Sequence, residues 1–221
     1  MNVKYSVGSR SFLALLLACA AWPVMGDPPA PGLDSGSEQT RPALPGKFVL
    51  TLKEGFFRLA DDSQTINNHD WKFNSPHSIY AIEGEGWIGP EKDLSIGGEI
   101  IYYDSRFKRT DAPNINHKMQ VRTLLVKPKY FFGSPNANWR PYIGAGFGHV
   151  DVTDNNGPIG GDAGGPAYQA VAGMQLRSER IGVRAEYMYL HAKVDDENDQ
   201  KVNASIHGLF LGLVFYFGSN R

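Results

Sequence analysis

The chain has very little cysteine, with one residue, Cys19, among 221. Cys19 lies in an N-terminal segment that we expect to be removed. The mature chain then has no cysteine for a disulfide, a thiolate nucleophile or a thiolate-bound metal. The chain also has no excess of positive charge, since 22 Lys and Arg stand against 23 Asp and Glu. This balance argues against a nucleic-acid-binding protein, which carries a basic surface.

Long apolar runs are missing as well. After residue 25 there is no run of about 18 uncharged apolar residues, which excludes an ordinary transmembrane helix in the mature chain. The absence is compatible with a β-barrel, because membrane-crossing strands are short and alternate in polarity. The aromatic share of 12% is not that of a disordered chain.

The N-terminus has the pattern of a secretory signal peptide, which we assign to residues 1–26. Lys4 and Arg10 form a positive start, an apolar stretch follows, and small residues precede Asp27. The sequence around Cys19 also resembles a lipoprotein processing box, but we favour ordinary cleavage near Gly26. Residues 27–46 are rich in proline and are expected to form an extended periplasmic tether.

From residue 47 onward, apolar and polar residues alternate with period two between repeated turn signals. This pattern predicts eight strands, at 47–60, 77–88, 94–107, 118–132, 140–151, 166–177, 181–193 and 204–217. They are longer than the usual five or six residues of a soluble strand. Long connections at 61–76, 108–117, 152–165 and 194–203 alternate with short ones. We therefore predict an all-β, eight-stranded antiparallel transmembrane β-barrel with up-and-down order over 47–217, its long loops outside the cell.

The alternation also predicts which side chains point into the barrel. The inward charged residues form the expected lumen ion-pair network: Glu83, Glu85, Glu99, Lys127, Lys129, Arg184 and Glu186. Lys53 is expected to join them, although Gly55 suggests a bulge in the first strand. Paired across a narrow barrel, such ions can be buried. The alternative is a set of solvated charges on the polar face of a soluble sheet.

Three segments resemble the small outer-membrane β-barrel families of Gram-negative bacteria, in the OmpA-like and opacity-type group. They are Trp139-Arg140-Pro141-Tyr142-Ile143-Gly144-Ala145-Gly146-Phe147-Gly148, Arg184-Ala185-Glu186-Tyr187-Met188-Tyr189 and the closing Gly212–Phe217. The resemblance covers about 170 residues and implies an outer-membrane location and a last strand recognised by the barrel-assembly machinery. It implies almost nothing about activity. One departure is that Gly218–Arg221 follow the terminal aromatic residue, Phe217.

Candidate chemical sites are weak. The six histidines fall near the predicted extracellular end without a metal-ligand spacing, so we predict no metal site and no cofactor. Ser205 and His207, facing His191, look like the set of lipid A deacylases, but that family's His-x-Ser pair is replaced by His191-Ala192-Lys193. We therefore predict no catalytic residues and no enzyme. The Gly-rich segment 157–165 has no lysine and opens no helix, so it is no phosphate-binding loop.

Four cations are expected on the outer face near the extracellular rim: Arg106, Lys108, Lys118 and Arg122. They could contact lipopolysaccharide phosphates, or be solvated charges at the base of a loop. The sequence thus predicts a monomeric, non-catalytic outer-membrane barrel with a structural or surface-interaction role, in contact with outer-membrane lipid and lipopolysaccharide. A small OmpW-like passive channel for apolar solutes, or a lipid A deacylase-like hydrolase, are the alternatives.

Overall fold

The computed structural model describes most of the chain between Lys47 and Gly218. The described ranges are 47–61, 63–66, 69–74, 77–88, 92–112, 116–135, 137–154, 162–178, 180–195 and 201–218. The expected signal peptide and tether lie outside these residues, so both stay predictions. Within the described ranges all regular secondary structure is β-strand. No helix there is long and apolar enough to span a membrane.

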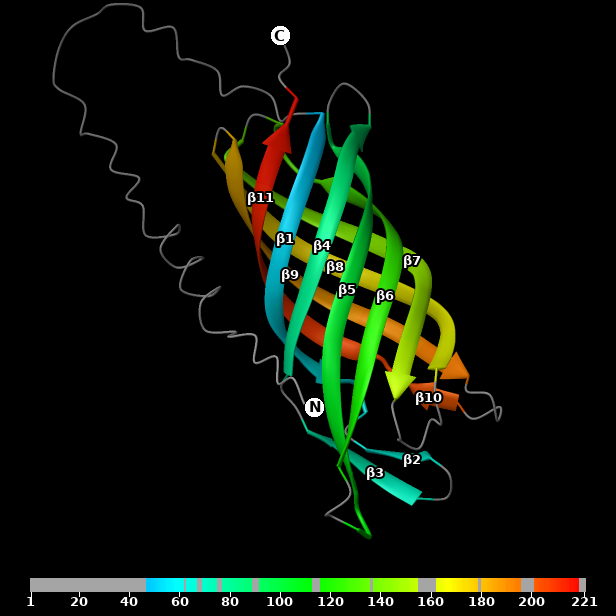
Figure 1. Ribbon diagram of the computed structural model, residues 1–221. Helices are drawn as coiled ribbons and strands as arrows, with labels where there is room; N and C mark the ends of the chain where they lie inside the picture. Colours follow the sequence, from blue (N-terminus) through cyan, green and yellow to red (C-terminus); the bar gives the residue numbers. More distant parts are fainter. Residues whose placement is uncertain are drawn as a thin grey trace, which may run out of the picture. The chain divides into compact units, whose positions relative to one another are not determined.

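The strands form one closed antiparallel barrel (Figure 1). They are β1 (Phe48–Leu59), β2 (Ser63–Ile66), β3 (His69–Asn74), β4 (His77–Ile88), β5 (Leu94–Arg109), β6 (Asn116–Phe131), β7 (Trp139–Asp154), β8 (Asp162–Arg177), β9 (Ile181–Asp195), β10 (Lys201–Asn203) and β11 (Ile206–Phe217). The first and last long strands pair, with Phe48 opposite Phe217, and this pairing closes the wall. The all-β, eight-stranded barrel predicted from the sequence is confirmed.

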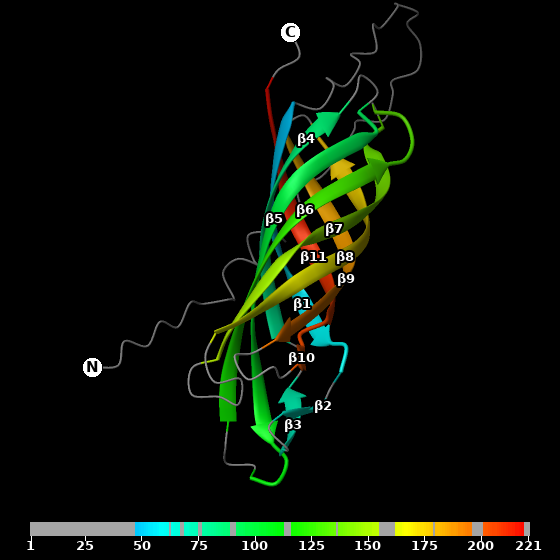
Figure 2. The same ribbon diagram turned by 90° about the vertical axis from the view of Figure 1, so that its right-hand side faces the viewer.

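Eleven strand segments occupy eight positions around the wall. The complete ring consists of β1, β4, β5, β6, β7, β8, β9 and β11. Beyond the end of β4, β3 continues the pairing with β5, and β2 pairs with β3. In the same way β10 continues the pairing of β11 with β9. The short strands therefore lengthen the wall at one end, called here the hairpin end, which lies at the bottom of Figure 1. Figure 2 shows β5 and β6 extending farthest toward it.

The segment 61–76 was predicted to be a long polar loop, and this prediction was wrong. Most of it is the β2–β3 hairpin, in which Ile66 and Trp71 are buried. The indole nitrogen of Trp71 donates a hydrogen bond to the Ile66 carbonyl oxygen (3.2 Å). The Gln64 side chain accepts from the backbone nitrogen of Asn203 (3.0 Å) and donates to its carbonyl oxygen (2.5 Å). This pair of hydrogen bonds links β2 to β10, so the two short extensions of the wall are connected to each other.

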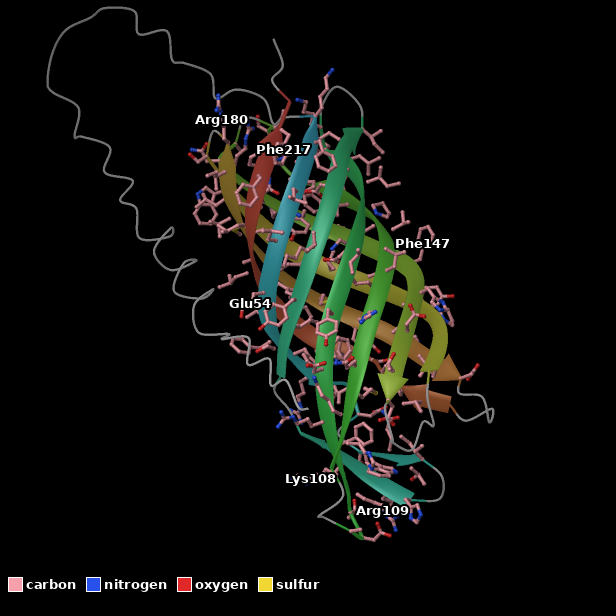
Figure 3. The ribbon with its side chains drawn as sticks, in the orientation of Figure 1. Glu54, Lys108, Arg109, Phe147, Arg180 and Phe217 are labelled. Atoms are coloured by element: carbon pink, nitrogen blue, oxygen red, sulfur yellow. The ribbon has the colours of Figure 1, made fainter. Side chains whose placement is uncertain are left out.

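Large apolar side chains cover the outer side of the wall. More than half of the residue surface is exposed at Phe56, Ile82, Ile100, Leu124, Ile143, Phe147, Tyr168 and Leu209. Figure 3 shows Phe147 on the outer side of the wall. A soluble monomer rarely exposes an apolar surface of this extent, which is typical of a surface covered by another apolar medium.

Inward side chains fill the barrel in two layers. The end of the barrel with the chain turns at Phe132, Gly133 and Arg180 is called here the turn end. Ions fill the layer nearer to it. Apolar side chains fill the layer toward the hairpin end, among them Phe57, Ile79, Ile101, Val121, Leu190 and Ile206, all at most 2% exposed. The ion-pair network expected from the sequence lies in the layer toward the turn end, and the apolar layer beyond it was not predicted.

Gly55 does not form the bulge that its position suggested. β1 pairs without interruption on both sides, and Gly55 lies opposite Phe210 and Ile79. A Cβ atom at this position would overlap the backbone carbonyl oxygen of Leu209. A close approach of β1 to β11 therefore requires the glycine, and the uninterrupted alternation turns Lys53 inward.

Candidate functional site

Lys53 lies at the centre of a buried group of ions inside the barrel. Its ammonium nitrogen lies 2.6 Å from a carboxylate oxygen of Glu83, 2.6 Å from one of Glu99 and 2.7 Å from one of Glu186. These three acids belong to β4, β5 and β9. One side chain of β1 therefore connects three other strands across the barrel.

Two lysines of β6 add to the group. The Lys127 nitrogen is 2.8 Å from Glu99 and 3.3 Å from Glu83. Lys129 forms an ion pair with Glu83 and lies 3.1 Å from Glu85. The two lysines are two residues apart, so they share one face of the strand. Both are completely enclosed.

Arg184 of β9 completes the group. Its guanidinium forms an ion pair with Glu85 and lies 3.4 Å from Glu83. It also donates to the side-chain oxygen of Gln175 (3.2 Å from Nε) and lies over the ring of Tyr142, 5.2 Å from its centroid. The charge of this arginine is thus offset by acids on one side and by polar and aromatic groups on the other.

Neutral residues that the sequence analysis missed hold the carboxylates in place. The Tyr142 hydroxyl donates to Glu186 (2.8 Å). The Gln169 amide donates to Glu99 (2.9 Å). These residues carry no charge, so the search for inward ions did not find them. Gln169 and Gln175 are an even number of residues apart on β8, and this spacing places both glutamines on the inward face, which could have been predicted from the sequence.

The charges of this buried group balance, with four acids against four bases: Glu83, Glu85, Glu99 and Glu186 against Lys53, Lys127, Lys129 and Arg184. Each of these residues is at most 3% exposed. Removing ions from water is costly, and close pairing offsets the cost. We call this group the ion layer. Eight strands enclose only enough room for side chains, so an arrangement of this kind can hold strands in register and close the lumen.

The structure places the four cations predicted to contact lipopolysaccharide on the outer side of β5 and β6, all of them exposed. Arg106 lies directly opposite Lys118. Lys72 of β3, which the sequence analysis missed, lies directly opposite Lys108. Like charges directly across a strand pair repel each other. Together with Arg122, these residues form what we call the basic face, a surface that favours a bound anion.

Acidic residues neutralise only part of the basic face. The Asp104 carboxylate lies 2.9 Å from the Lys118 nitrogen, on the surface. Asp151 of β7 lies opposite Arg122 in the strand register. The two like-charged pairs still leave a positive excess toward the hairpin end.

Arg109, next to the basic face, is paired with an acid and does not add to that excess. Its guanidinium lies 2.6 Å from Asp111, and its hydrogen bonds to this carboxylate lower the pKa of Asp111 to about 2. Figure 3 shows Lys108 and Arg109 at the end of the barrel opposite Arg180 and Phe217. The basic face is therefore confined to one end of the wall.

The residues considered for a hydrolase do not form the expected set. The Ser205 hydroxyl lies 3.1 Å from Nδ1 of His191, whereas Nδ1 of His207 lies 2.8 Å from the Tyr187 hydroxyl. Ser205 is also 1% exposed, which leaves its oxygen out of reach of a substrate. In the ranges described, no three His, Cys, Asp or Glu side chains lie close enough together to hold a metal. Most of the Gly-rich segment 157–165 falls outside those ranges.

Comparison with solved structures shows the fold. Neisserial surface protein A is similar over 78% of this chain and 98% of its own length, with a TM-score of 0.56 and 15% identity. The outer membrane protein OprG from Pseudomonas aeruginosa is similar over 81% of this chain and 99% of its own, with a TM-score of 0.50 and 12% identity. No family model and no curated protein sequence matches the chain.

Proposed function

We propose that the protein is an outer-membrane β-barrel of a Gram-negative bacterium, with a non-catalytic role in the structure of the membrane and in surface contacts. The apolar outer wall supports burial in lipid, since the large side chains of β5, β6 and β11 would be costly to expose to water. We further propose that the barrel is a monomer, and that its last strand, which ends in Phe217, is recognised by the barrel-assembly machinery.

The filled interior gives no support to the passive-channel alternative. The ion layer and the apolar layer occupy successive levels of the lumen, and their central side chains are fully enclosed. A solute could pass along the axis only if buried ion pairs were separated. On this proposal the purified barrel shows no stepwise conductance in planar bilayers.

The basic face is the observation on which the proposed surface role depends. It lies at the hairpin end, just beyond apolar side chains such as Ile100 and Leu124, so in a membrane it would lie at the level of lipid headgroups. Phosphate groups of lipopolysaccharide would relieve the repulsion between Arg106 and Lys118 and between Lys72 and Lys108. Arginine and lysine both make charge-assisted hydrogen bonds to phosphate.

Replacing Arg106 and Arg122 together by glutamine is expected to lower the affinity of the refolded barrel for purified lipopolysaccharide by about tenfold. Two guanidinium groups that donate to phosphate are lost, while the side-chain length is nearly kept. Binding of the unaltered chain is expected to weaken as salt rises, because the contacts are at the surface. Both effects can be measured by titration in a maltoside detergent.

Arg180→Gln is the matched control for this double variant. Arg180 is exposed at the turn end and carries the same charge, but it lies far from the basic face (Figure 3). Its loss is expected to leave binding unchanged. Equal affinity of the double variant and the unaltered chain would leave only the account of solvated charges at the base of a loop.

The proposed topology places the hairpin end outside the cell and the turn end in the periplasm. The mature chain has no cysteine, so single cysteines report position directly. Thr110→Cys, at the hairpin end, is expected to react with a membrane-impermeant maleimide on intact cells. Asn138→Cys, exposed at the turn end, is expected to react only after the cells are broken. The opposite labelling pattern would reverse the orientation.

A further inference from the structure

A second polar group lies on the outer wall, on β9 and β11. It consists of Tyr187, Tyr189, His191 and His207, with the buried Ser205 behind His191, and we call it the ring row. The three β9 residues alternate with buried neighbours, so their rings lie on the outer side. In the order of the sheet, β4 and β1 separate β11 from β5. The ring row and the basic face are therefore on different sides of the barrel.

Hydroxyl groups hold both imidazole rings of the row. The Tyr187 hydroxyl lies 2.8 Å from Nδ1 of His207. The Ser205 hydroxyl lies 3.1 Å from Nδ1 of His191, and it also accepts a hydrogen bond from the backbone nitrogen of Ala192 (3.2 Å). Because the Ser205 oxygen already accepts from this amide, its own proton is available to donate to the histidine.

The two hydroxyl contacts fit a neutral imidazole whose proton is on Nε2. A neutral imidazole with a hydroxyl donor at Nδ1 has its proton on Nε2. In this tautomer His191 and His207 each have one N–H donor on the far side of the ring. Tyr189 lies between them, with its centroid 4.8 Å from that of His207 and 6.4 Å from that of His191. The result is a continuous row of rings with a donor near each end.

The row lies where the apolar wall ends. On β11 the exposed Leu209 and Leu211 follow His207 at intervals of two residues. Tyr187 lies opposite Leu209, and Arg58 of β1 lies opposite His207. On the proposed topology, the two imidazoles are therefore at the level where acyl chains meet phosphorylated sugars in the outer leaflet.

We propose that the ring row binds the phosphorylated glucosamine headgroup of the outer-leaflet glycolipid, with Nε2–H of His191 and of His207 donating to phosphate oxygens. Tyr189 supplies an aromatic face against the sugar. This inference rests on the proposed membrane location and orientation, but it uses no residue of the basic face. It gives the barrel two headgroup contacts on different sides of its wall.

The test is the double variant His191→Phe with His207→Phe, which keeps both rings and removes both donors. Binding is measured in maltoside detergent with two probes, lipid A carrying both phosphates and lipid A with both phosphates removed. We expect about a tenfold loss of affinity for the first probe, and no change for the second. Heat-dependent migration on gels verifies that the variant barrel is folded.

Two further variants keep the test decisive. His207→Gln retains an N–H donor and is expected to keep more affinity than His207→Phe, and the pair can be compared if the double variant does not fold. Tyr130→Phe removes an exposed hydroxyl of β6, which does not border the strands of the row, and is expected to have no effect. An equal loss for both probes, or no loss for either, would overturn the proposal.

The two headgroup contacts can be tested separately. The histidine variants are repeated in a chain that already carries Arg106→Gln and Arg122→Gln. A loss that persists in this chain belongs to the ring row alone. If the arginine variants bind lipopolysaccharide normally while the histidine variants lose affinity for phosphorylated lipid A, the surface role is reassigned to the ring row. A failure of the histidines alone leaves the basic face unaffected.

Discussion

Replacing Lys53 by methionine is expected to lower the free energy of unfolding by about 3 to 5 kcal/mol. The lysine contacts Glu83, Glu99 and Glu186 within 2.7 Å, and no water can take its place around a side chain that is almost fully enclosed. Methionine keeps the apolar stem, so the loss comes from the charge. Urea titration of the barrel refolded in lipid vesicles measures the change.

Two comparisons isolate the charge effect. Lys193→Met makes the same change at an exposed position of β9 and is expected to shift stability by about 0.5 kcal/mol or less. Adding Glu99→Leu to Lys53→Met restores the balance of acids and bases, and is expected to recover part of the loss, because neighbouring sites couple. A loss below about 1 kcal/mol in Lys53→Met would show that the ion layer contributes little.

Gly55→Ala is expected to cost about 3 kcal/mol or more, or to prevent folding. The added methyl group would overlap the carbonyl oxygen of Leu209, which belongs to the backbone of β11 and cannot rotate away. Relief requires β1 and β11 to separate at the place where the barrel closes. The fraction of chain that reaches the heat-stable, fast-migrating form reports the effect.

Gly98→Ala is the matched control in a neighbouring part of the wall. A Cβ atom at Gly98 meets only the Leu125 carbonyl oxygen, at 3.9 Å, which is ordinary contact. Alanine there is expected to be neutral or slightly stabilising, because a strand glycine loses more backbone entropy on folding. Equal tolerance at both positions would mean that β1 and β11 can move apart without cost.

The sequence predicted the eight wall positions because each long strand alternates clearly in at least part of its length. Pairs such as Lys127 and Lys129, two residues apart between apolar neighbours, mark the inward face directly. The number of partners of Lys53 could not be predicted. It depends on which residues of β4, β5 and β9 reach the same height across the barrel, and this register is set by the whole wall.

The apolar layer and the β2–β3 hairpin were not predicted, because the residue types in these segments gave a misleading pattern. Leu190 and Val194 of β9 point into the apolar layer, because the polarity of the two faces reverses along this strand. The turn-end half has its apolar side chains outside, whereas the hairpin-end half has them inside and polar side chains such as Lys193 outside, so one rule for the whole strand does not find this layer. The β2–β3 hairpin was taken for a loop because Asp and Asn surround its apolar residues. Lys72 lies in that hairpin, so the fifth cation of the basic face was missed for the same reason.

The closing seam between β1 and β11 has a consequence for the kinetics of folding. It pairs residues from opposite ends of the barrel sequence, from Phe48 with Phe217 to Leu59 with Ile206. Contacts between such distant residues make folding slow, because a long chain segment must be ordered before they form. Lys53 lies on β1, which also pairs with β4, so its contacts with Glu83 and Glu99 need no closure, whereas its contact with Glu186 of β9 brings together the two sides of the seam. Closure of the wall therefore completes the ion layer as well, and the chain has an open strand edge until then.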